Sequence, residues 1–170
     1  MRIGIFPNLV KRECAGIVQQ LIEICQKHHI AYYLPAYVSE SCQPLYQHIG
    51  AEHLRPHMTM YRSIDVAVVL GGDGTILKMA KQFAETGIPI CGVNLGSLGF
   101  LYEVETETLE KRMLDIMQGH YFTEERMMLQ GVIYDEDGVE QSLPPALNDI
   151  VIAHGNVGKL IRIDMSINGH

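Results

Sequence analysis

The sequence lacks the features of several large protein classes. It has no long uninterrupted apolar segment, so we expect no membrane-spanning helix. The stretch from Met1 to Pro7 is too short and too soon interrupted for a secretory signal peptide, and it is predicted to be a strand. Basic residues are few: 13 Lys and Arg stand against 20 Asp and Glu, and the net charge of −7 disfavours nonspecific binding to nucleic acid or acidic membranes.

Common disulfide and zinc motifs are also missing. The four cysteines form no Cys-x-x-Cys pair. Three of them, Cys14, Cys25 and Cys91, lie in helix or strand patterns typical of small buried hydrophobic residues, which favours a reducing cytoplasm. The eight histidines form no His-Glu-x-x-His, and a proline between His53 and His57 disfavours a continuous helix there. We therefore do not expect a zinc site.

What is present suits a globular protein with a proper core. The chain has 170 residues, of which 47% are hydrophobic, enough for one domain or for one domain and part of another. Apolar patterns predict strands at 2–6, 30–34, 64–70 and 88–93, and helices at 11–29, 76–83 and 107–118. No element is assigned within residues 35–63, which hold three prolines. Strands that alternate with helices indicate a parallel α/β sheet.

The most informative segment is Gly71–Thr75, with the sequence GGDGT, between the strand 64–70 and a helix. Its three glycines let a ligand approach the backbone N–H groups, and the helix start adds partial positive charge suited to phosphate. Asp73 adds a carboxylate, which is unfavourable beside a phosphate unless it holds a metal or takes a proton. The combination suggests phosphoryl transfer, although strand–glycine–helix units also occur in proteins without a phosphate ligand.

Other parts of the sequence limit how a phosphate would be bound. A Walker A loop is excluded because no Gly-Lys-Ser/Thr follows at the required spacing. Lys78 and Lys81 lie one turn into the helix, and we expect them to face solvent rather than a phosphate. A second glycine-rich turn, Asn94–Leu101, follows the strand 88–93, so both turns follow the carboxyl ends of strands, where they could face one crevice.

The pattern changes after Gly119. Strands are predicted at 127–134, 139–143, 147–153 and 160–167, with a hairpin turn at 135–138 and no helical pattern between them. This predicts a second, antiparallel β domain over residues 120–170, after an α/β domain over 1–119. Asn168-Gly169 is a strong hairpin signal followed by His170 alone, so we expect the chain to stop inside a domain; a frayed tail is the alternative.

Three segments together resemble the NAD kinase family. They are Gly71–Thr75, Asn94–Leu101, and Ala146–Asp149 before an apolar strand, and their order and separations match over essentially the whole chain. The first segment alone is less specific, since diacylglycerol and sphingosine kinases share it. The resemblance implies a Rossmann-like N-terminal domain and a C-terminal β domain, with an active site between them that a neighbouring subunit often completes.

The resemblance also implies a reaction. Such enzymes transfer a phosphoryl group from ATP, or in some members polyphosphate, to the 2′-hydroxyl of the adenosine ribose of NAD, and they form NADP. They need Mg²⁺ or Mn²⁺, and we expect a homodimer or homotetramer. Two other functions stay open: a diacylglycerol-type lipid kinase that shares only the GGDGT loop, and a dinucleotide-binding module without catalysis.

Site residues follow from the match. Asp73 corresponds to the family's essential aspartate, which is proposed to activate the 2′-hydroxyl, to organise metal, or both. Phe100 corresponds to an aromatic residue beside the adenine, with core packing as the alternative, and Asn148 and Asp149 correspond to an Asn-acid pair that binds ribose hydroxyls, with a turn as the alternative. The implied nucleotide-binding residues are Gly72, Gly74, Thr75, Leu77, Leu98, Gly99, Phe100, Asn148 and Asp149.

The chain departs from the family pattern in two places. The family pair is usually Asn-Glu, whereas Asp149 keeps the charge with one methylene less reach. The family also carries a further Gly-Asp-Gly segment and a Thr-Gly-Ser-Thr-Ala-Tyr segment, and neither is in this sequence. We therefore expect the chain to be the N-terminal part of such an enzyme, with weak substrate binding or none by itself.

Overall fold

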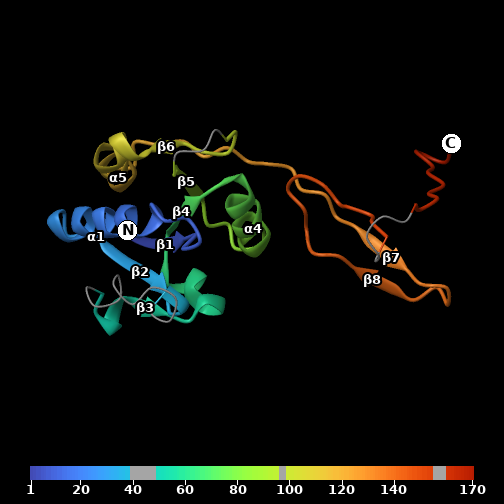
Figure 1. Ribbon diagram of the computed structural model, residues 1–170, viewed down its shortest axis with the longest axis horizontal. Helices are drawn as coiled ribbons and strands as arrows, with labels where there is room; N and C mark the ends of the chain where they lie inside the picture. Colours follow the sequence, from blue (N-terminus) through green and yellow to red (C-terminus); the bar gives the residue numbers. More distant parts are fainter. Residues whose placement is uncertain (39–48, 96–98, 155–159) are drawn as a thin grey trace. The chain divides into compact units, whose positions relative to one another are not determined.

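The computed structural model describes residues 1–38, 49–95, 99–154 and 160–170 (Figure 1). The chain divides into two compact units, Met1–Met127 and Met128–His170, and each is described by itself. The division falls a few residues beyond the domain boundary expected near residue 120, and that boundary stays a prediction. None of the described helices has the length and apolarity that a membrane span needs.

The first unit is built on a six-stranded parallel sheet with the order β3-β2-β1-β4-β5-β6. The strands are β1 (Arg2–Pro7), β2 (Ala31–Pro35), β3 (Leu54–Arg55), β4 (Val66–Gly71), β5 (Ile90–Asn94) and β6 (Val104–Glu105). This confirms the predicted parallel α/β architecture. The sheet runs outward from β1 in one direction and from β4 in the other, so its topological switch point lies between these two strands.

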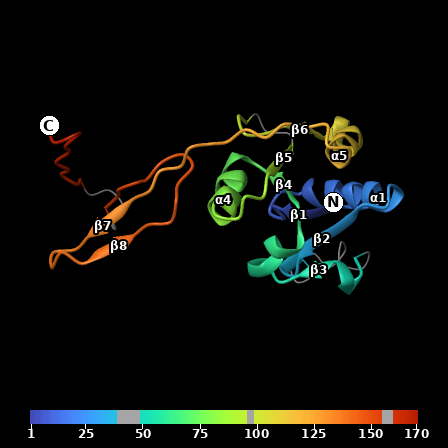
Figure 2. The same ribbon diagram turned by 180° about the vertical axis from the view of Figure 1, so that it is seen from behind.

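Helices cover both faces of this sheet, as Figures 1 and 2 show from opposite sides. The helices are α1 (Cys14–Lys27), α4 (Asp73–Phe83) and α5 (Leu109–Met117), with short 3-10 helices η1 (Ala51–His53), η2 (His57–Ser63) and η3 (Thr106–Thr108). Helices α1 and α5 pack in one core cluster, and α4 and η2 pack in another. The helices that follow β1 and β4 therefore lie on opposite faces, as a doubly wound sheet requires.

Strand β4 shows why the sequence forms a sheet with two covered faces. All its residues are buried. Val66, Val68 and Leu70 belong to the cluster beneath α1 and α5, whereas Ala67 and Val69 belong to the cluster beneath α4. Successive side chains point to opposite faces of a strand, so a continuous apolar run is what a doubly covered strand needs.

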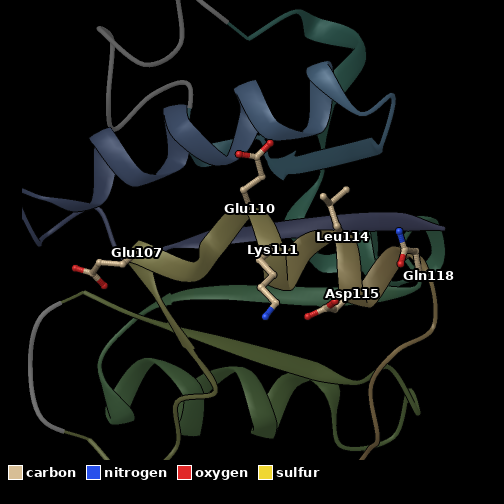
Figure 3. Close-up of a pocket in the computed structure, with 6 residues that line it drawn as sticks. All are labelled: Glu107, Glu110, Lys111, Leu114, Asp115 and Gln118. Atoms are coloured by element: carbon tan, nitrogen blue, oxygen red, sulfur yellow. The ribbon is translucent and has the colours of Figure 1, made fainter.

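The two helices on one face are also joined at their surface. In α5, the buried residues Leu109, Met113 and Ile116 recur at helical spacing. Glu110 points from α5 toward α1, where its Oε1 lies 2.7 Å from Lys27 Nζ and 2.8 Å from His28 Nε2 (Figure 3). These contacts hold the last strand–helix unit of the sheet against the first.

The prediction that the cysteines behave as small hydrophobic residues is confirmed for those that the structure describes. Cys14 and Cys25 have no exposed surface, and Cys91 is partly buried and packs against the same core. Burial raises the pKa of both Cys25 and Cys91 to about 12, and the charge of Glu103 adds to the effect at Cys91. These thiols therefore act as small hydrophobic side chains. Cys42 lies outside the described residues.

The second unit contains the predicted hairpin. Strand β7 (Val132–Tyr134) pairs antiparallel with β8 (Glu140–Ser142), and an isolated bridge joins Leu129 to Ala146. Asp135 Oδ1 accepts hydrogen bonds from the N–H groups of Asp137 and Val139, and Gly138 takes φ 78°. The predicted turn over 135–138 is therefore confirmed, with glycine at the position that needs a positive φ.

The other two strands predicted for this unit are wrong for the described residues. The segments 147–154 and 160–166 contain no strand. Ile152 and Leu160 are exposed by 69% and 99%, so the apolar pattern finds no packing surface there. A strand needs hydrogen-bonded neighbours and a covered face. The Asn168-Gly169 turn does form, because both residues have positive φ and Ile167 and His170 exchange two backbone hydrogen bonds.

Candidate functional site

The glycine turn begins at the last residue of strand β4. Gly71 ends β4 and Gly72 precedes α4, so Asp73 is the first residue of the helix. The Gly72 carbonyl accepts hydrogen bonds from the N–H groups of Thr75 at 2.6 Å and Ile76 at 3.2 Å. The Thr75 hydroxyl in turn accepts the Gly72 N–H at 3.3 Å. These bonds close the first helical turn. A Cβ at Gly71 would collide with the Thr75 side chain, so this position needs glycine.

The two glycine turns meet at Asp73. Its Oδ2 accepts the Phe100 N–H at 3.1 Å, and its Oδ1 accepts the Leu101 N–H at 3.2 Å. Strand pairing explains the meeting, since Gly71 of β4 lies opposite Asn94 of β5 and the two strands end side by side. The carboxylate therefore sits between the positive helix start and two N–H donors of the second turn.

Phe100 is not a core residue. Its side chain is 94% exposed, so the core-packing alternative is wrong, and the ring is accessible to a ligand. Gly99 is tightly enclosed, because a Cβ there would lie 2.6 Å from Asp73 Oδ1 and 2.6 Å from the ring of Tyr102. Leu98 lies outside the described residues.

Asn8 and Tyr102 belong to this site but were not predicted from the sequence. Asn8 directly follows β1, and its Nδ2 donates to Thr75 Oγ1 at 3.1 Å while its N–H donates to the Leu70 carbonyl at 2.8 Å. The Tyr102 hydroxyl is buried, has no hydrogen-bond partner among the described residues, and lies next to Gly72. Burial, and then the charge of Asp73, raises the pKa of Tyr102, which keeps its phenol protonated.

A cleft of about 960 Å³ opens on the β1 side of the glycine turn. It is lined by the end of β1 and the residues that follow it, by the glycine turn and α4, and by one ring after β2 and one from η2: Phe6, Pro7, Asn8, Leu9, Val10, Lys11, Tyr37, His57, Gly72, Gly74, Thr75, Lys78, Met79 and Gln82. Its position outside the carboxyl ends of β1 and β4, at the switch point, is where open α/β sheets bind ligands. Lys78 and Lys81 are both exposed, as expected, and Lys78 also lines this cleft.

A second hollow of about 540 Å³ lies over η3 and α5 and contains none of the predicted site residues (Figure 3). Among the six described residues that line it, Glu107, Glu110 and Asp115 are carboxylates and Lys111 is the one cation. Glu110 points toward α1, whereas Lys111 and Asp115 point to the other side of the helix. This acidic, divergent surface is unsuited to a phosphate ligand.

Comparison with known proteins identifies the family. Residues 3–121 match the model of the ATP-NAD kinase N-terminal domain. The chain belongs to the NAD kinase family. An NAD kinase of Natranaerobius thermophilus is 32% identical over 169 residues, which cover 99% of this chain and 56% of the relative. An NAD kinase of Heliobacterium modesticaldum is 47% identical over 106 residues, which cover 62% of this chain and 37% of the relative.

Solved structures agree on the fold. A yeast NADH kinase, solved in complex with NADH, superposes with a TM-score of 0.72 at 18% identity over 87% of this chain and 47% of that one. An NAD kinase from Archaeoglobus fulgidus, in complex with ATP, gives 0.54 at 20% identity over 81% of this chain and 45% of that one. This chain thus spans about half the length of the NAD kinases that it matches.

The remaining predicted residues of the family site lie in separate places. Leu77 is partly buried on α4, one turn after Gly74. Asn148 and Asp149 belong to the second unit, where both are exposed and Asn148 Nδ2 donates to Asp149 Oδ1 at 2.9 Å. The structure thus brings Asp73 together with Gly72, Thr75, Gly99 and the backbone of Phe100. It describes Asn148 and Asp149 only within their own unit.

Proposed function

We propose that this chain serves NAD kinase activity, the transfer of a phosphoryl group from ATP or polyphosphate to the 2′-hydroxyl of the adenosine ribose of NAD. The observation that carries the proposal is the Asp73 carboxylate, held at the start of α4 by two N–H groups of the second glycine turn. Membership of the family, and relatives that bear the name NAD kinase, support the choice of substrate. The lipid-kinase alternative rests on the GGDGT loop alone.

Asp73 suits the role of general base toward the acceptor hydroxyl. A carboxylate offers about four acceptor positions, and the Phe100 and Leu101 amides use two of them, so acceptor capacity remains for a substrate hydroxyl. A general base contributes roughly 10²–10⁴-fold to a rate. Most of the acceleration must therefore come from positioning the reactants and from stabilising charge on the transferred group.

The glycines and the exposed ring suit nucleotide binding. Gly72 and Gly74 leave the backbone of the turn open, and Thr75 contributes a hydroxyl at its edge. Phe100 presents a ring to solvent beside Asp73, as stacking on an adenine requires. We assign Leu77, Leu98 and Gly99 to the same binding surface.

We assign the ribose hydroxyls to the pair Asn148 and Asp149. Amide and carboxylate groups are suitable partners for a diol, and both side chains are exposed. Their mutual hydrogen bond holds the Asp149 carboxylate next to the Asn148 amide, so the pair offers donor and acceptor together.

A divalent cation fits this chemistry. The described residues contain no group of three His, Cys, Asp or Glu side chains that could cage a metal. Mg²⁺ is usually held by one or two carboxylates together with substrate phosphates and water, so Asp73 alone is a sufficient protein ligand. When bound, Mg²⁺ or Mn²⁺ neutralises charge on the phosphates. The proposal also includes a cytoplasmic location, a homodimer or homotetramer, and a domain boundary near residue 120.

The test is NADP formation from NAD, ATP and Mg²⁺ by the gene's full-length product, with Asp73→Asn beside it. We expect wild-type turnover and a loss of at least about 10²-fold in the variant, with dinucleotide binding retained. Glu85→Gln, an exposed carboxylate just beyond α4, is the matched control and keeps full turnover. Unchanged turnover in Asp73→Asn refutes the catalytic assignment. Diacylglycerol phosphorylation without NADP formation favours the lipid kinase, and dinucleotide binding without turnover favours the binding module.

A further inference from the structure

Asn8 directly follows β1 and is fixed in place by its backbone. Pro7, the last residue of β1, lies opposite Leu70 of β4 in the parallel register. The Asn8 N–H donates to the Leu70 carbonyl at 2.8 Å, and the Asn8 carbonyl accepts the Lys11 N–H at 3.1 Å. The side chain of Asn8 therefore starts from a defined point at the carboxyl ends of these two neighbouring strands.

The side-chain amide of Asn8 can take only one orientation. Its Oδ1 accepts the Val10 N–H at 3.3 Å, and its Nδ2 lies 3.1 Å from Thr75 Oγ1. A backbone N–H can only donate, so the amide oxygen must face Val10. The amide nitrogen must then face Thr75, and because this NH₂ group only donates, Thr75 Oγ1 is the acceptor.

The Thr75 hydroxyl is left with a proton to donate. Besides the bond from Asn8, its oxygen accepts the Gly72 N–H at 3.3 Å. A hydroxyl has two lone pairs and one proton, so two donors occupy both lone pairs. Among the described residues no acceptor receives the proton, and Thr75 is a half-buried residue that lines the 960 Å³ cleft.

Asn8 prevents a competing arrangement of this hydroxyl. A threonine hydroxyl in a helix often donates back to a backbone carbonyl three or four residues earlier, which here belongs to Gly72 or Gly71. Such a bond is local and needs no partner from another strand. The amide of Asn8 opposes it, because only one direction of the O–H bond presents a lone pair to Asn8 and the other to Gly72.

We propose that Asn8 is a positioning residue for the reaction, and that it fixes the Thr75 hydroxyl as a hydrogen-bond donor to an oxygen atom of a bound substrate. The inference rests on the proposed function and adds a residue to it. Asn8 acts through Thr75 and moves no proton itself. A hydroxyl whose direction is set before binding loses less freedom when the substrate arrives, which strengthens the contact.

Asn8→Asp in the full-length protein tests the direction of the hydrogen bond. The carboxylate has the shape of the amide and still accepts the Val10 N–H, but toward Thr75 it accepts where asparagine donates. The Thr75 proton then turns inward, so we expect kcat/KM for NAD or for ATP to fall about tenfold. Both side-chain hydrogen bonds survive, so the urea unfolding midpoint stays close to that of wild type.

Two comparison variants separate this role from charge and from packing. Gln20→Glu makes the same change of charge on the exposed face of α1 and is expected to alter neither kcat/KM nor the unfolding midpoint. Asn8→Leu has a similar size, removes both side-chain hydrogen bonds and is expected to lower the midpoint. An Asn8→Asp protein that is destabilised as much as Asn8→Leu, or that keeps its kcat/KM for both substrates, overturns the inference.

A double-mutant cycle tests whether Asn8 acts through Thr75. Thr75→Val keeps the shape of the side chain and removes the hydroxyl. In that background we expect Asn8→Asp to change kcat/KM less than about twofold, whereas in Thr75→Ser, which keeps the hydroxyl, the loss of about tenfold returns. A tenfold loss in the Thr75→Val background shows direct contact with substrate or an effect of charge, and it overturns the positioning role.

Binding measurements keep this inference separate from the proposed activity. Calorimetric titration with NAD and with ATP gives dissociation constants without turnover. We expect Asn8→Asp to weaken the binding of one of these ligands about tenfold, and to have less than about a twofold effect when Thr75→Val is also present. Equal affinities across the cycle overturn the inference even if NADP forms normally. Coupled loss of affinity in a protein that forms no NADP rejects the proposed function and supports the role of Asn8.

Discussion

Replacement of Gly99 by alanine tests whether the contact between the two glycine turns controls Asp73. An added Cβ would lie 2.6 Å from Asp73 Oδ1 and 2.6 Å from Tyr102, against about 3.4 Å for ordinary contact. The carboxylate or the second turn must therefore shift by about 0.8 Å. A shift of that size disturbs the two hydrogen bonds that Asp73 accepts from Phe100 and Leu101.

The expected effect is larger on catalysis than on stability. A displacement of about 1 Å at a reacting group costs roughly 10²-fold in rate, so we expect kcat of the full-length Gly99→Ala protein to fall by about that factor. Overpacking of this kind costs about 1–3 kcal/mol of unfolding free energy, which leaves the protein folded. Steady-state NADP formation and urea unfolding measure the two quantities on the same sample.

Gly16→Ala is the control for inserting a methyl group at a glycine. Gly16 lies in α1, where an added Cβ meets nothing within 4 Å. We expect unchanged kcat and a gain of about 0.5–1 kcal/mol in unfolding free energy, because alanine is the better helix former. If Gly99→Ala keeps kcat within about threefold of wild type, Asp73 does not depend on its contact with the second turn, and the reasoning fails.

Three further predictions concern the framework around the site. Leu21→Ala is expected to lower the unfolding free energy by about 2–5 kcal/mol, measured by urea unfolding, because Leu21 is fully buried on the core-facing side of α1. Cys25 is expected to react with a thiol reagent only after denaturation, because burial raises its pKa to about 12. Hydrogen bonds from His28 and Lys27 lower the pKa of Glu110, so this carboxylate stabilises the fold above the unfolded-state pKa and loses that contribution as the pH falls through the folded-state pKa. Glu110→Gln should therefore be less stable than wild type at neutral pH, and thermal unfolding should show the difference vanish in acid; a constant difference contradicts the ion-pair account.

The framework of the first unit was predictable because its elements have strong local patterns. A buried strand such as β4 is a continuous apolar run, and α5 repeats its apolar residues at helical spacing. The start of α4 was placed too late, at Ile76, because the apolar repeat begins there. The true start at Asp73 depends on backbone hydrogen bonds to Gly72, which leave no hydrophobic pattern.

The region between β2 and β4 was unpredictable for a different reason. Strand β3 has two residues and exists because it pairs with β2. The ring of His53 stacks on Tyr32 of β2, with centroids 4.0 Å apart and planes 3° from parallel. Such elements are held by residues far away in sequence, so no local period marks them. The segments of the second unit that were wrongly predicted as strands show the opposite case, a local pattern without distant partners. Val151 lies in a suitable strand pattern but is 74% exposed.

The candidate site likewise contains residues that the sequence could identify and residues that only the structure identifies. Asp73 and Gly99 lie in motifs that are contiguous in sequence, and resemblance to the family identified them. Asn8 carries no motif, and its hydrogen bond to Thr75 spans 67 positions, so its importance appears only once β1 and β4 are known to be neighbours. Tyr102 follows the second turn directly, yet its pattern is that of an ordinary aromatic residue, and only the structure shows that its hydroxyl is buried with no partner in the described part of the chain.

The structure explains how the Asp73 carboxylate is accommodated in a turn that attracts anions. A phosphate and a carboxylate compete for the same positive helix start. In the folded protein, Asp73 takes two N–H donors from a different turn, on the β5 side, while the lysines of the cleft lie on the β1 side. The competition is therefore resolved by strand order: β4 lies between β1 and β5, so one glycine turn can present an anion on one flank and cations on the other.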